Sequence, residues 1–374
     1  MTLRTNAAVL WEAPGKWRIE ELEVADPGPG DVQIQVMAAG LCHSDSAMAT
    51  GDSPVQYFPW IGGHEGAGIV TAVGSEVRSV SVGDHVVTIF IPSCGHCRWC
   101  ASGLGNLCDE GARIMALGSG DEDFRLRTIA GQGVGQTALL GTFSQYTMVP
   151  EQSVIKIGKD IPFTAAALVA CGVPTGWGAA VNAGNVAPGD TVIVMGVGGI
   201  GINSVQGAKH AGASHILAVD PAPFKQQKAL EFGATEAFSD IVEATERAHQ
   251  LTNGQGADVT LFSVGLSTPE TIGPALESVR KAGTLVVTSL GRPDANGIPA
   301  NLLMLPLYQK RIQGSLFGAQ PPAAAVPRLL NLYRAGQLKL DELVSKVYSL
   351  DQINEAYDDV DAGTVLRPII EMSH

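Results

Sequence analysis

A repeated alternation of apolar strands and helices, beginning at Thr191, constrains the fold of this chain more than any other feature. The apolar run "TVIVM" (191–195) leads into the glycine-rich "GVGGIG", and a helical segment then extends to about Ala211. Three further apolar strands follow, "HILAVD" (215–220), "ADVTLFSVG" (257–265) and "GTLVVTSLG" (283–291), with helical segments between them. Continuous apolar strands separated by helices are typical of a parallel sheet that is covered on both faces. The sequence therefore predicts a doubly wound α/β domain.

The glycine-rich loop is a candidate phosphate-binding site, because it follows a strand and opens a helix. Gly196 permits the tight turn, Gly198 lets a pyrophosphate approach the backbone, and Gly201 allows close helix–strand packing. Asp220 ends the next strand, where a carboxylate hydrogen-bonds the adenosine ribose and repels a 2′-phosphate. An ordinary glycine turn in an α/β protein is the less favoured reading. The predicted NAD(H) contacts here are Gly196, Gly198, Gly199, Ile200, Gly201 and Asp220.

The first ~170 residues have a different, mostly β pattern, so a chain of 374 residues is expected to hold two domains. "DVQIQVMA" (31–38) places Val32, Ile34 and Val36 on one face of a strand. "GAGIVTAVG" and "VGDHVVTIF" predict two further strands, and 163–181 predicts a helix interrupted at Gly172–Pro174. The last ~60 residues predict helices around 321–335 and 351–361 and a final strand "TVLRPIIEM". The polar segment 121–127 is expected on the surface.

Four of the six cysteines lie within fifteen residues, in the pattern C-x2-C-x2-C-x7-C. Four thiolates at this spacing can surround one tetrahedral zinc ion and leave no coordination position for a substrate. The cluster is therefore predicted to be a structural zinc site. An iron–sulfur cluster and two disulfides remain alternatives, although a reducing compartment favours a metal over disulfides. The ligands are Cys94, Cys97, Cys100 and Cys108.

The two remaining cysteines are candidates for the reactive site. Cys42 lies in "GLCHSD" and Cys171 in "CGVPTGWG", and His64 lies between them in "GGHEGAG". Two thiolates and one imidazole would hold zinc and leave a fourth position open to substrate. Each cysteine alone would be read as a small buried apolar residue. The division of six cysteines into four and two, with none left over, favours a second zinc ion per chain.

Composition limits the partners. The formal net charge of −13 argues against a nucleic-acid or anionic-membrane partner, which would require a basic surface. No apolar run approaches the ~18 residues of a membrane span, and the N-terminal segment carries charges throughout. We therefore expect a cytoplasmic protein that acts on a small molecule.

These motifs, in this order, resemble the zinc-containing medium-chain alcohol dehydrogenases over essentially the whole chain. Within that family, "CGVPTGWG", "NLCDEGA" and "LYRAGQLKLDELV" are most similar to the nitrosoaniline (NDMA)-dependent enzymes of actinobacteria, which are nicotinoproteins. The resemblance implies a GroES-like β-rich catalytic domain over 1–172, with the structural-zinc lobe at 94–108. It also implies a Rossmann doubly wound coenzyme domain over 173–315, and a return to the catalytic domain over 316–374.

The resemblance assigns roles to residues that match the family's motifs. It implies that Cys42, His64 and Cys171 bind the catalytic zinc ion and that Asp45 orients the zinc-bound imidazole. Glu65 would lie near that metal, Ser44 would hydrogen-bond the substrate oxygen, and Phe90 would form a wall of the substrate pocket. Further cofactor contacts are implied for His43, Thr175, Lys225 and Arg367. Ala47 departs from the family pattern, because a proton-relay histidine is usual at that position, and His43 stands where many relatives have arginine.

The implied activity is reversible hydride transfer between an alcohol or aldehyde and NAD(H), with the nicotinamide tightly bound and re-oxidised by an electron acceptor. The family is oligomeric, so a homo-oligomer is expected. A thiol-dependent formaldehyde dehydrogenase is one alternative, because it uses the same zinc chemistry. A non-catalytic nucleotide-binding protein on the same fold is another.

Overall fold

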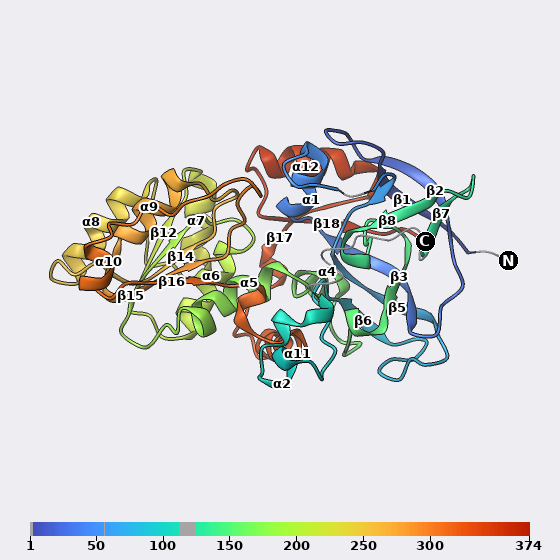
Figure 1. Ribbon diagram of the computed structural model, residues 1–374, viewed down its shortest axis with the longest axis horizontal. Helices are drawn as coiled ribbons and strands as arrows, with labels where there is room; N and C mark the ends of the chain where they lie inside the picture. Colours follow the sequence, from blue (N-terminus) through green and yellow to red (C-terminus); the bar gives the residue numbers. More distant parts are fainter. Residues whose placement is uncertain (1–2, 56, 112–123) are drawn as a thin grey trace. The chain divides into compact units, whose positions relative to one another are not determined.

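The computed structural model describes residues 3–55, 57–111 and 124–374. The chain divides into two units, Met1–Cys171 with Pro321–His374 and Gly172–Gln320. The first unit is built on β-sheets and the second on a sheet with helices (Figure 1). This agrees with the predicted change from β to βαβ along the chain.

The first unit contains a small closed barrel. Its strands pair in the order β1-β2-β7-β8-β4, and β4 returns to β1. Leu126 and Val134 face the interior and are fully buried. The strands are β1 (Leu3–Leu10), β2 (Arg18–Val24), β4 (Trp60–Ile61), β7 (Leu126–Thr128) and β8 (Gly133–Gln136).

A larger sheet carries the rest of this unit. Its strand order among the described residues is β10-β6-β5-β3-β18-β17, with β9 paired to β3. The alternation predicted for 31–38 is confirmed, because Val32, Ile34 and Val36 are all fully buried. The strands are β3 (Asp31–Gly40), β5 (Glu65–Val73), β6 (His85–Thr88), β9 (Tyr146–Pro150), β10 (Val154–Ile157), β17 (Val344–Tyr348) and β18 (Arg367–Glu371).

Short helices connect these strands, and both predicted C-terminal helices are confirmed. The α-helices are α1 (His43–Thr50), α2 (Arg98–Ala101), α4 (Phe163–Leu168), α11 (Pro322–Arg334) and α12 (Ile353–Asp361). The 3₁₀ turns are η1 (Gly105–Leu107), η2 (Thr137–Leu139), η3 (Glu151–Ser153), η6 (Asp341–Leu343) and η7 (Leu350–Gln352).

The second unit has the predicted parallel sheet. Its strands run in the order β13-β12-β11-β14-β15-β16, and all of these pairs are parallel. Val192, Ile193 and Val194 are fully buried, as expected of a strand covered on both faces. The strands are β11 (Thr191–Met195), β12 (His215–Val219), β13 (Glu236–Phe238), β14 (Ala257–Phe262), β15 (Val279–Val287) and β16 (Arg311–Gly314).

Helices α6, α8 and α9 pack against this sheet. Asp240 caps α8, because its side chain accepts from the backbone N–H groups of Val242 and Glu243. The helices of the unit are α5 (Gly172–Gly178), the π-helix η4 (Ala179–Ala183), α6 (Gly201–His210), α7 (Pro223–Phe232), α8 (Ile241–Leu251), α9 (Pro269–Glu277), α10 (Met304–Leu307) and the 3₁₀ turn η5 (Phe317–Ala319).

Two sequence predictions require correction. The helical segment 163–181 breaks at 169–171, and Gly172–Pro174 begins the next helix instead of interrupting one. Proline is tolerated in a first helical turn, because its missing N–H would have no partner there. The segment 121–127 is not wholly a surface excursion. Residues 121–123 lie outside the described residues, but the side chains of Phe124 and Leu126 are buried in the barrel.

Among the described residues, no helix is both long enough and apolar enough to cross a membrane.

Candidate functional site

The four closely spaced cysteines come together in the first unit. Their sulfur atoms all lie within 4.8 Å of one another, and the structure has them as thiols rather than disulfides. Backbone N–H groups point at the sulfurs: Cys94 N lies 3.3 Å from Cys108 Sγ, and Cys97 N lies 3.3 Å from Cys94 Sγ. The backbone N–H of Cys100 is the main cause that lowers the pKa of Cys97 to about 6. Burial raises the pKa of Cys100 to about 12, so that thiol would lose its proton only to a cation. The lobe can thus offer four sulfur ligands to one cation.

A second cluster forms from residues far apart in the sequence. Ligand atoms of Cys42, His64, Glu65 and Cys171 all lie within 4.8 Å of one another. Cys42 precedes α1, His64 directly precedes β5, which begins at Glu65, and Cys171 follows α4. His64 and Cys171 are less than a tenth exposed, and Glu65 is fully buried. The separation is compatible with ligands around one ion, since Zn–S and Zn–N bonds are about 2.3 and 2.0–2.1 Å long.

Asp45 holds the imidazole of His64. Its Oδ2 lies 2.9 Å from His64 Nδ1, and its Oδ1 accepts from the backbone N–H of Gly63 at 2.8 Å. Burial is the largest single influence and lowers the pKa of His64, but the Asp45 carboxylate and the Cys42 sulfur together raise that pKa well above its ordinary value. A metal that bound Nε2 would displace the proton there, while the Asp45 carboxylate would keep the other proton on Nδ1.

The two thiols of this cluster lie close enough to interact. Cys171 donates to Cys42, which is the main cause that lowers the pKa of Cys42 well below its ordinary value. The same hydrogen bond, followed by burial, raises the pKa of Cys171 well above its own. A divalent cation would replace that proton and pair with two thiolates at once. The donor set of two sulfurs and one imidazole nitrogen is that of an open zinc site.

Glu65 and Arg367 form a buried ion pair beside this cluster. Glu65 is fully buried and Arg367 is 5% exposed, and an Arg367 Nη2 hydrogen donates to Glu65 Oε2. Burial raises the pKa of Glu65, and Arg367 opposes that rise. Glu65 Oε1 has no hydrogen-bond partner among the described residues. The free oxygen leaves Glu65 able to contact a cation or a water molecule in the cluster.

The remaining catalytic candidates lie close to the same atoms. Ser44 Oγ donates to Cys42 Sγ at 3.2 Å, so the hydroxyl points at a proposed ligand. The ring of Phe90 meets the His64 ring edge-on, with centroids 5.5 Å apart. His43 is exposed on α1, and Ala47 lies one turn further along that helix.

The glycine loop of the second unit has the backbone conformation and the open space that a phosphate site requires. Gly196 has φ of +86°, which favours glycine. A Cβ at Gly201 would collide with the backbone oxygen of Gly196, so this residue must be small. A Cβ at Gly198 would have no described atom within 4 Å, so the backbone there is open to a ligand. Gly199 and Ile200 complete the turn into α6.

Asp220 is tied to the same loop. Its Oδ2 accepts from the N–H of Val197 at 2.9 Å, and its Oδ1 accepts from the N–H of Ala222 at 3.0 Å. A carboxylate offers about four acceptor positions, so two remain for ribose hydroxyls. The sequence predicted the ribose contact but not the bond to Val197.

Thr175 and Lys225 also belong to the second unit. Thr175 is buried on α5, which packs closely on α6. Lys225 lies in the first turn of α7, and Asp220 lies just before that helix. His43 and Arg367 belong to the first unit, and Arg367 is buried against Glu65. Their predicted contacts with the cofactor remain predictions.

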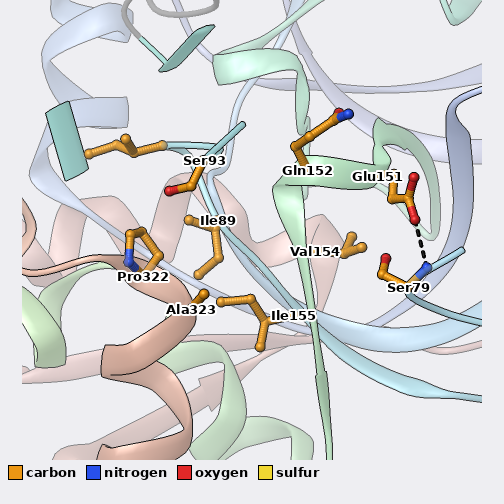
Figure 2. A pocket seen from close by; sticks show the side chains of 10 residues that line it. Ser79, Ile89, Ser93, Glu151, Gln152, Val154, Ile155, Pro322 and Ala323 are labelled. Atoms are coloured by element: carbon orange, nitrogen blue, oxygen red, sulfur yellow. Dashed lines mark hydrogen bonds between the residues drawn. The ribbon is translucent and has the colours of Figure 1, made fainter. Parts of the chain in front are cut away.

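A shallow pocket of about 260 Å³ also occurs in the first unit, but no predicted site residue lines it. Figure 2 shows its apolar side chains, among them Ile89, Ile155 and Pro322, and the bond from the Ser79 N–H to Glu151. Glu151 Oε1 accepts from Ser79 N at 2.6 Å and from Arg78 N at 2.7 Å. The carboxylate therefore stabilises the local backbone and does not mark a reactive site.

Comparison with known proteins identifies the family. Residues 28–159 match the alcohol dehydrogenase GroES-like domain, and residues 199–334 match the zinc-binding dehydrogenase domain. The chain is 47% identical to the NDMA-dependent alcohol dehydrogenase of Amycolatopsis methanolica, over 98% of this chain and 99% of that protein. It is 46% identical to putative alcohol dehydrogenase D of Mycobacterium tuberculosis, over 98% and 100% of the two chains.

Solved structures agree. Benzyl alcohol dehydrogenase of Acinetobacter calcoaceticus superposes with a TM-score of 0.91 at 29% identity, covering 99% of this chain and all of that one. The chain belongs to the zinc-binding medium-chain alcohol dehydrogenase family. It is an oxidoreductase of the alcohol dehydrogenase type, with a GroES-like domain and a Rossmann domain. The predicted resemblance and fold class are confirmed, and the comparisons favour neither alternative function.

The Glu65–Arg367 pair generates a stability prediction. Replacing Arg367 by Met leaves a buried carboxylate without its partner, so Arg367→Met should lower the free energy of unfolding by about 3–5 kcal/mol. The loss should be smaller in the double variant Glu65→Gln/Arg367→Met. Urea unfolding of the purified proteins measures both.

Arg334 provides the matched control, because its pair with Asp160 is exposed. Arg334→Met should cost no more than about 1 kcal/mol. Equal midpoints for Arg334→Met and Arg367→Met would show that the buried pair contributes no more than a surface pair.

Proposed function

We propose that the protein is a zinc- and NAD-dependent alcohol dehydrogenase that transfers hydride reversibly between an alcohol or aldehyde and NAD(H). The observation that carries the proposal is the cluster of Cys42, His64 and Cys171, with ligand atoms within 4.8 Å and Ser44 Oγ beside it. An alcohol, or the corresponding aldehyde in the reverse direction, is the substrate class. The names of the relatives, all alcohol dehydrogenases, support this class.

The chain's own residues would divide the work as follows. Zinc held by Cys42, His64 and Cys171 would supply the Lewis acid that stabilises negative charge on the substrate oxygen. Ser44 would accept the hydroxyl proton, and Asp45 would keep the imidazole in the Nδ1–H form. Phe90 would exclude water from one side of the reacting carbon. Because Ala47 carries no acid or base, the proton must leave Ser44 without an imidazole at that position.

The second unit would serve as the coenzyme domain, and the first as the catalytic domain. The glycine loop from Gly196 to Gly201 would bind the pyrophosphate, and Asp220 would bind the adenosine ribose. A 2′-phosphate would lie against the Asp220 carboxylate, so NAD is preferred over NADP. Thr175 and Lys225 would add contacts to the nicotinamide side and to the ribose.

Metal analysis tests the proposed function. The purified protein should contain two zinc ions per chain and oxidise simple alcohols. Cys42→Ser should lose one zinc ion and all turnover while leaving the fold intact. Cys100→Ser should lose the other zinc ion and lower the melting temperature. Wild-type protein that holds two zinc ions but shows no alcohol or aldehyde turnover would reject the activity while sparing the metal sites.

We also propose that the nicotinamide stays bound during turnover and that an electron acceptor re-oxidises it in place. This rests on the 47% identity to an NDMA-dependent alcohol dehydrogenase. Heat denaturation of protein purified without added cofactor should release about one NAD(H) per chain, identified by mass. Alcohol and nitrosoaniline should give ping-pong kinetics with no added NAD. Nucleotide-free protein whose rate saturates with added NAD⁺ would instead be an ordinary exchanging dehydrogenase.

The expected homo-oligomer is supported by one edge of the second unit. All four residues of β16 are exposed, and the described residues pair this strand only with β15. Large apolar side chains nearby are also exposed, including Leu290 at 71%, Leu302 at 84% and Leu307 at 65%. An open strand edge with exposed apolar side chains beside it can pair with another strand. We propose that two copies pair through β16 about a twofold axis.

Sedimentation tests this assembly. The wild-type protein should have about twice the 38.9 kDa mass of one chain. Ile312→Glu should produce single chains, because it places a carboxylate on each strand at the proposed axis. Val242→Glu is the control, since Val242 is 61% exposed on α8 and does not belong to this edge. A dimer that persists in Ile312→Glu would exclude this edge as the interface.

A further inference from the structure

Three aromatic side chains from distant parts of the first unit pack together behind the metal-candidate cluster. They are Trp17, Phe143 and Tyr357, which we call the aromatic cluster. The ring centroids lie 5.8 Å apart for Trp17–Phe143, 6.5 Å for Trp17–Tyr357 and 6.3 Å for Phe143–Tyr357. The exposed fractions of these residues are 4%, 0% and 6%. The cluster is therefore a rigid, buried group.

This cluster contacts two of the three segments that carry proposed metal ligands, namely those of Cys42 and His64. The Tyr357 hydroxyl donates to the backbone oxygen of Cys42 at 3.4 Å. On the other side, a Cβ at Gly62 would collide with Trp17 and lie 2.9 Å from the Phe143 ring. The backbone N–H of Phe143 donates to the carbonyl oxygen of Gly62 at 3.1 Å. The aromatic cluster thus supports Cys42 directly and His64 through Gly62.

The C-terminal helix α12 is fastened to the cluster by a reciprocal pair of hydrogen bonds. Trp17 N donates to Asn354 Oδ1 at 3.1 Å, and Asn354 Nδ2 donates to Trp17 O at 2.9 Å. Asn354 and Tyr357 are three residues apart, so they lie on the same face of α12. Figure 1 shows α12 beside α1, the helix that follows Cys42. The last segment of the chain therefore reaches the start of α1.

The hydrogen bond from Tyr357 reaches the backbone at the point where α1 begins. The Cys42 oxygen already accepts from the N–H groups of Asp45 at 3.1 Å and Ser46 at 3.5 Å, at the N-terminus of α1. The Tyr357 hydroxyl is a third donor to this oxygen, so it further restrains the peptide plane between Cys42 and His43. That plane sets the direction of the Cys42 side chain and the placement of Ser44, two residues on.

We propose that Tyr357 is a positioning residue, whose hydroxyl holds the Cys42 carbonyl and so aims the Cys42 sulfur and the Ser44 hydroxyl at the reacting atoms. It touches neither substrate nor cofactor in this proposal. Its effect on turnover rests on the proposed function, whereas its effect on α1 does not.

Tyr357→Phe tests the proposal, because it removes only the hydroxyl and keeps the ring in the cluster. Tyr348→Phe is the matched control. Tyr348 is a buried tyrosine of the same C-terminal segment, and its hydroxyl donates to Asp359 instead of the site. Both variants should melt within a few degrees of the wild type, since each keeps its aromatic packing.

Three measurements distinguish the variants. In Tyr357→Phe, backbone amides of residues 43–50 should exchange with deuterium several-fold faster than in the wild type. One of the two zinc ions should pass to a chelator several-fold faster, while the cysteine-cluster zinc ion serves as an internal reference. Turnover number should fall about fivefold to twentyfold with little change in KM, because small misplacements of reacting groups slow chemistry strongly. Tyr348→Phe should match the wild type in all three.

The outcomes separate this proposal from the proposed function. Unchanged amide exchange over residues 43–50 in Tyr357→Phe would overturn the positioning role, whatever the activity. Faster exchange with unchanged zinc release and turnover would also overturn it, because the hydroxyl would then stabilise α1 without aiming its ligands. If the wild type shows no alcohol turnover, the proposed function fails, while exchange and zinc release still decide the role of Tyr357.

Discussion

The site around Cys42 depends on pairing each buried ionisable side chain with a partner of opposite charge. Two thiols, an imidazole and a carboxylate contribute ligand atoms within 4.8 Å of one another, and the imidazole and carboxylate residues are at most 5% exposed. Such groups are costly to bury unless each has a partner. Asp45 provides one for His64 and Arg367 provides one for Glu65. A divalent cation bound between Cys42 and Cys171 would compensate the charge of two thiolates.

This requirement explains several features of the backbone that surrounds the site. Gly40 must lack a side chain, because a Cβ there would meet the Glu65 carboxylate. Gly63 has φ of +87°, so it turns the chain just before His64. Its backbone N–H donates to the Asp45 carboxylate, which in turn contacts the His64 ring. Arg367 arrives on β18, which pairs with β3 and so brings the end of the chain beside its beginning. The sheet is the frame that holds these charges together.

The sequence predicted the elements well where the signal was local. Alternating apolar residues at 31–38 indicate a strand buried on one face, and the continuous apolar run from Thr191 indicates a strand buried on both faces. The structure has a strand at each place. The break near Cys171 was misplaced, because glycine and proline mark helix starts as well as helix ends. The two cysteine groups followed from spacing and count. The Glu65–Arg367 pair and the Tyr357–Cys42 bond join residues more than 300 positions apart, and a single sequence carries no periodic signal for such contacts.

The bond between Asp220 and Val197 adds a physical argument about the nucleotide site. A glycine-rich loop is flexible by composition, and ordering it on binding would cost conformational entropy. Here the carboxylate fixes the loop through Val197, and Ala222 fixes the carboxylate in turn. Part of this ordering would therefore be complete before the proposed nucleotide bound, which would raise the affinity without any new contact to the ligand. A preorganised loop would suit the retained cofactor that we propose, whereas the rate of release would still depend on what encloses the nicotinamide end.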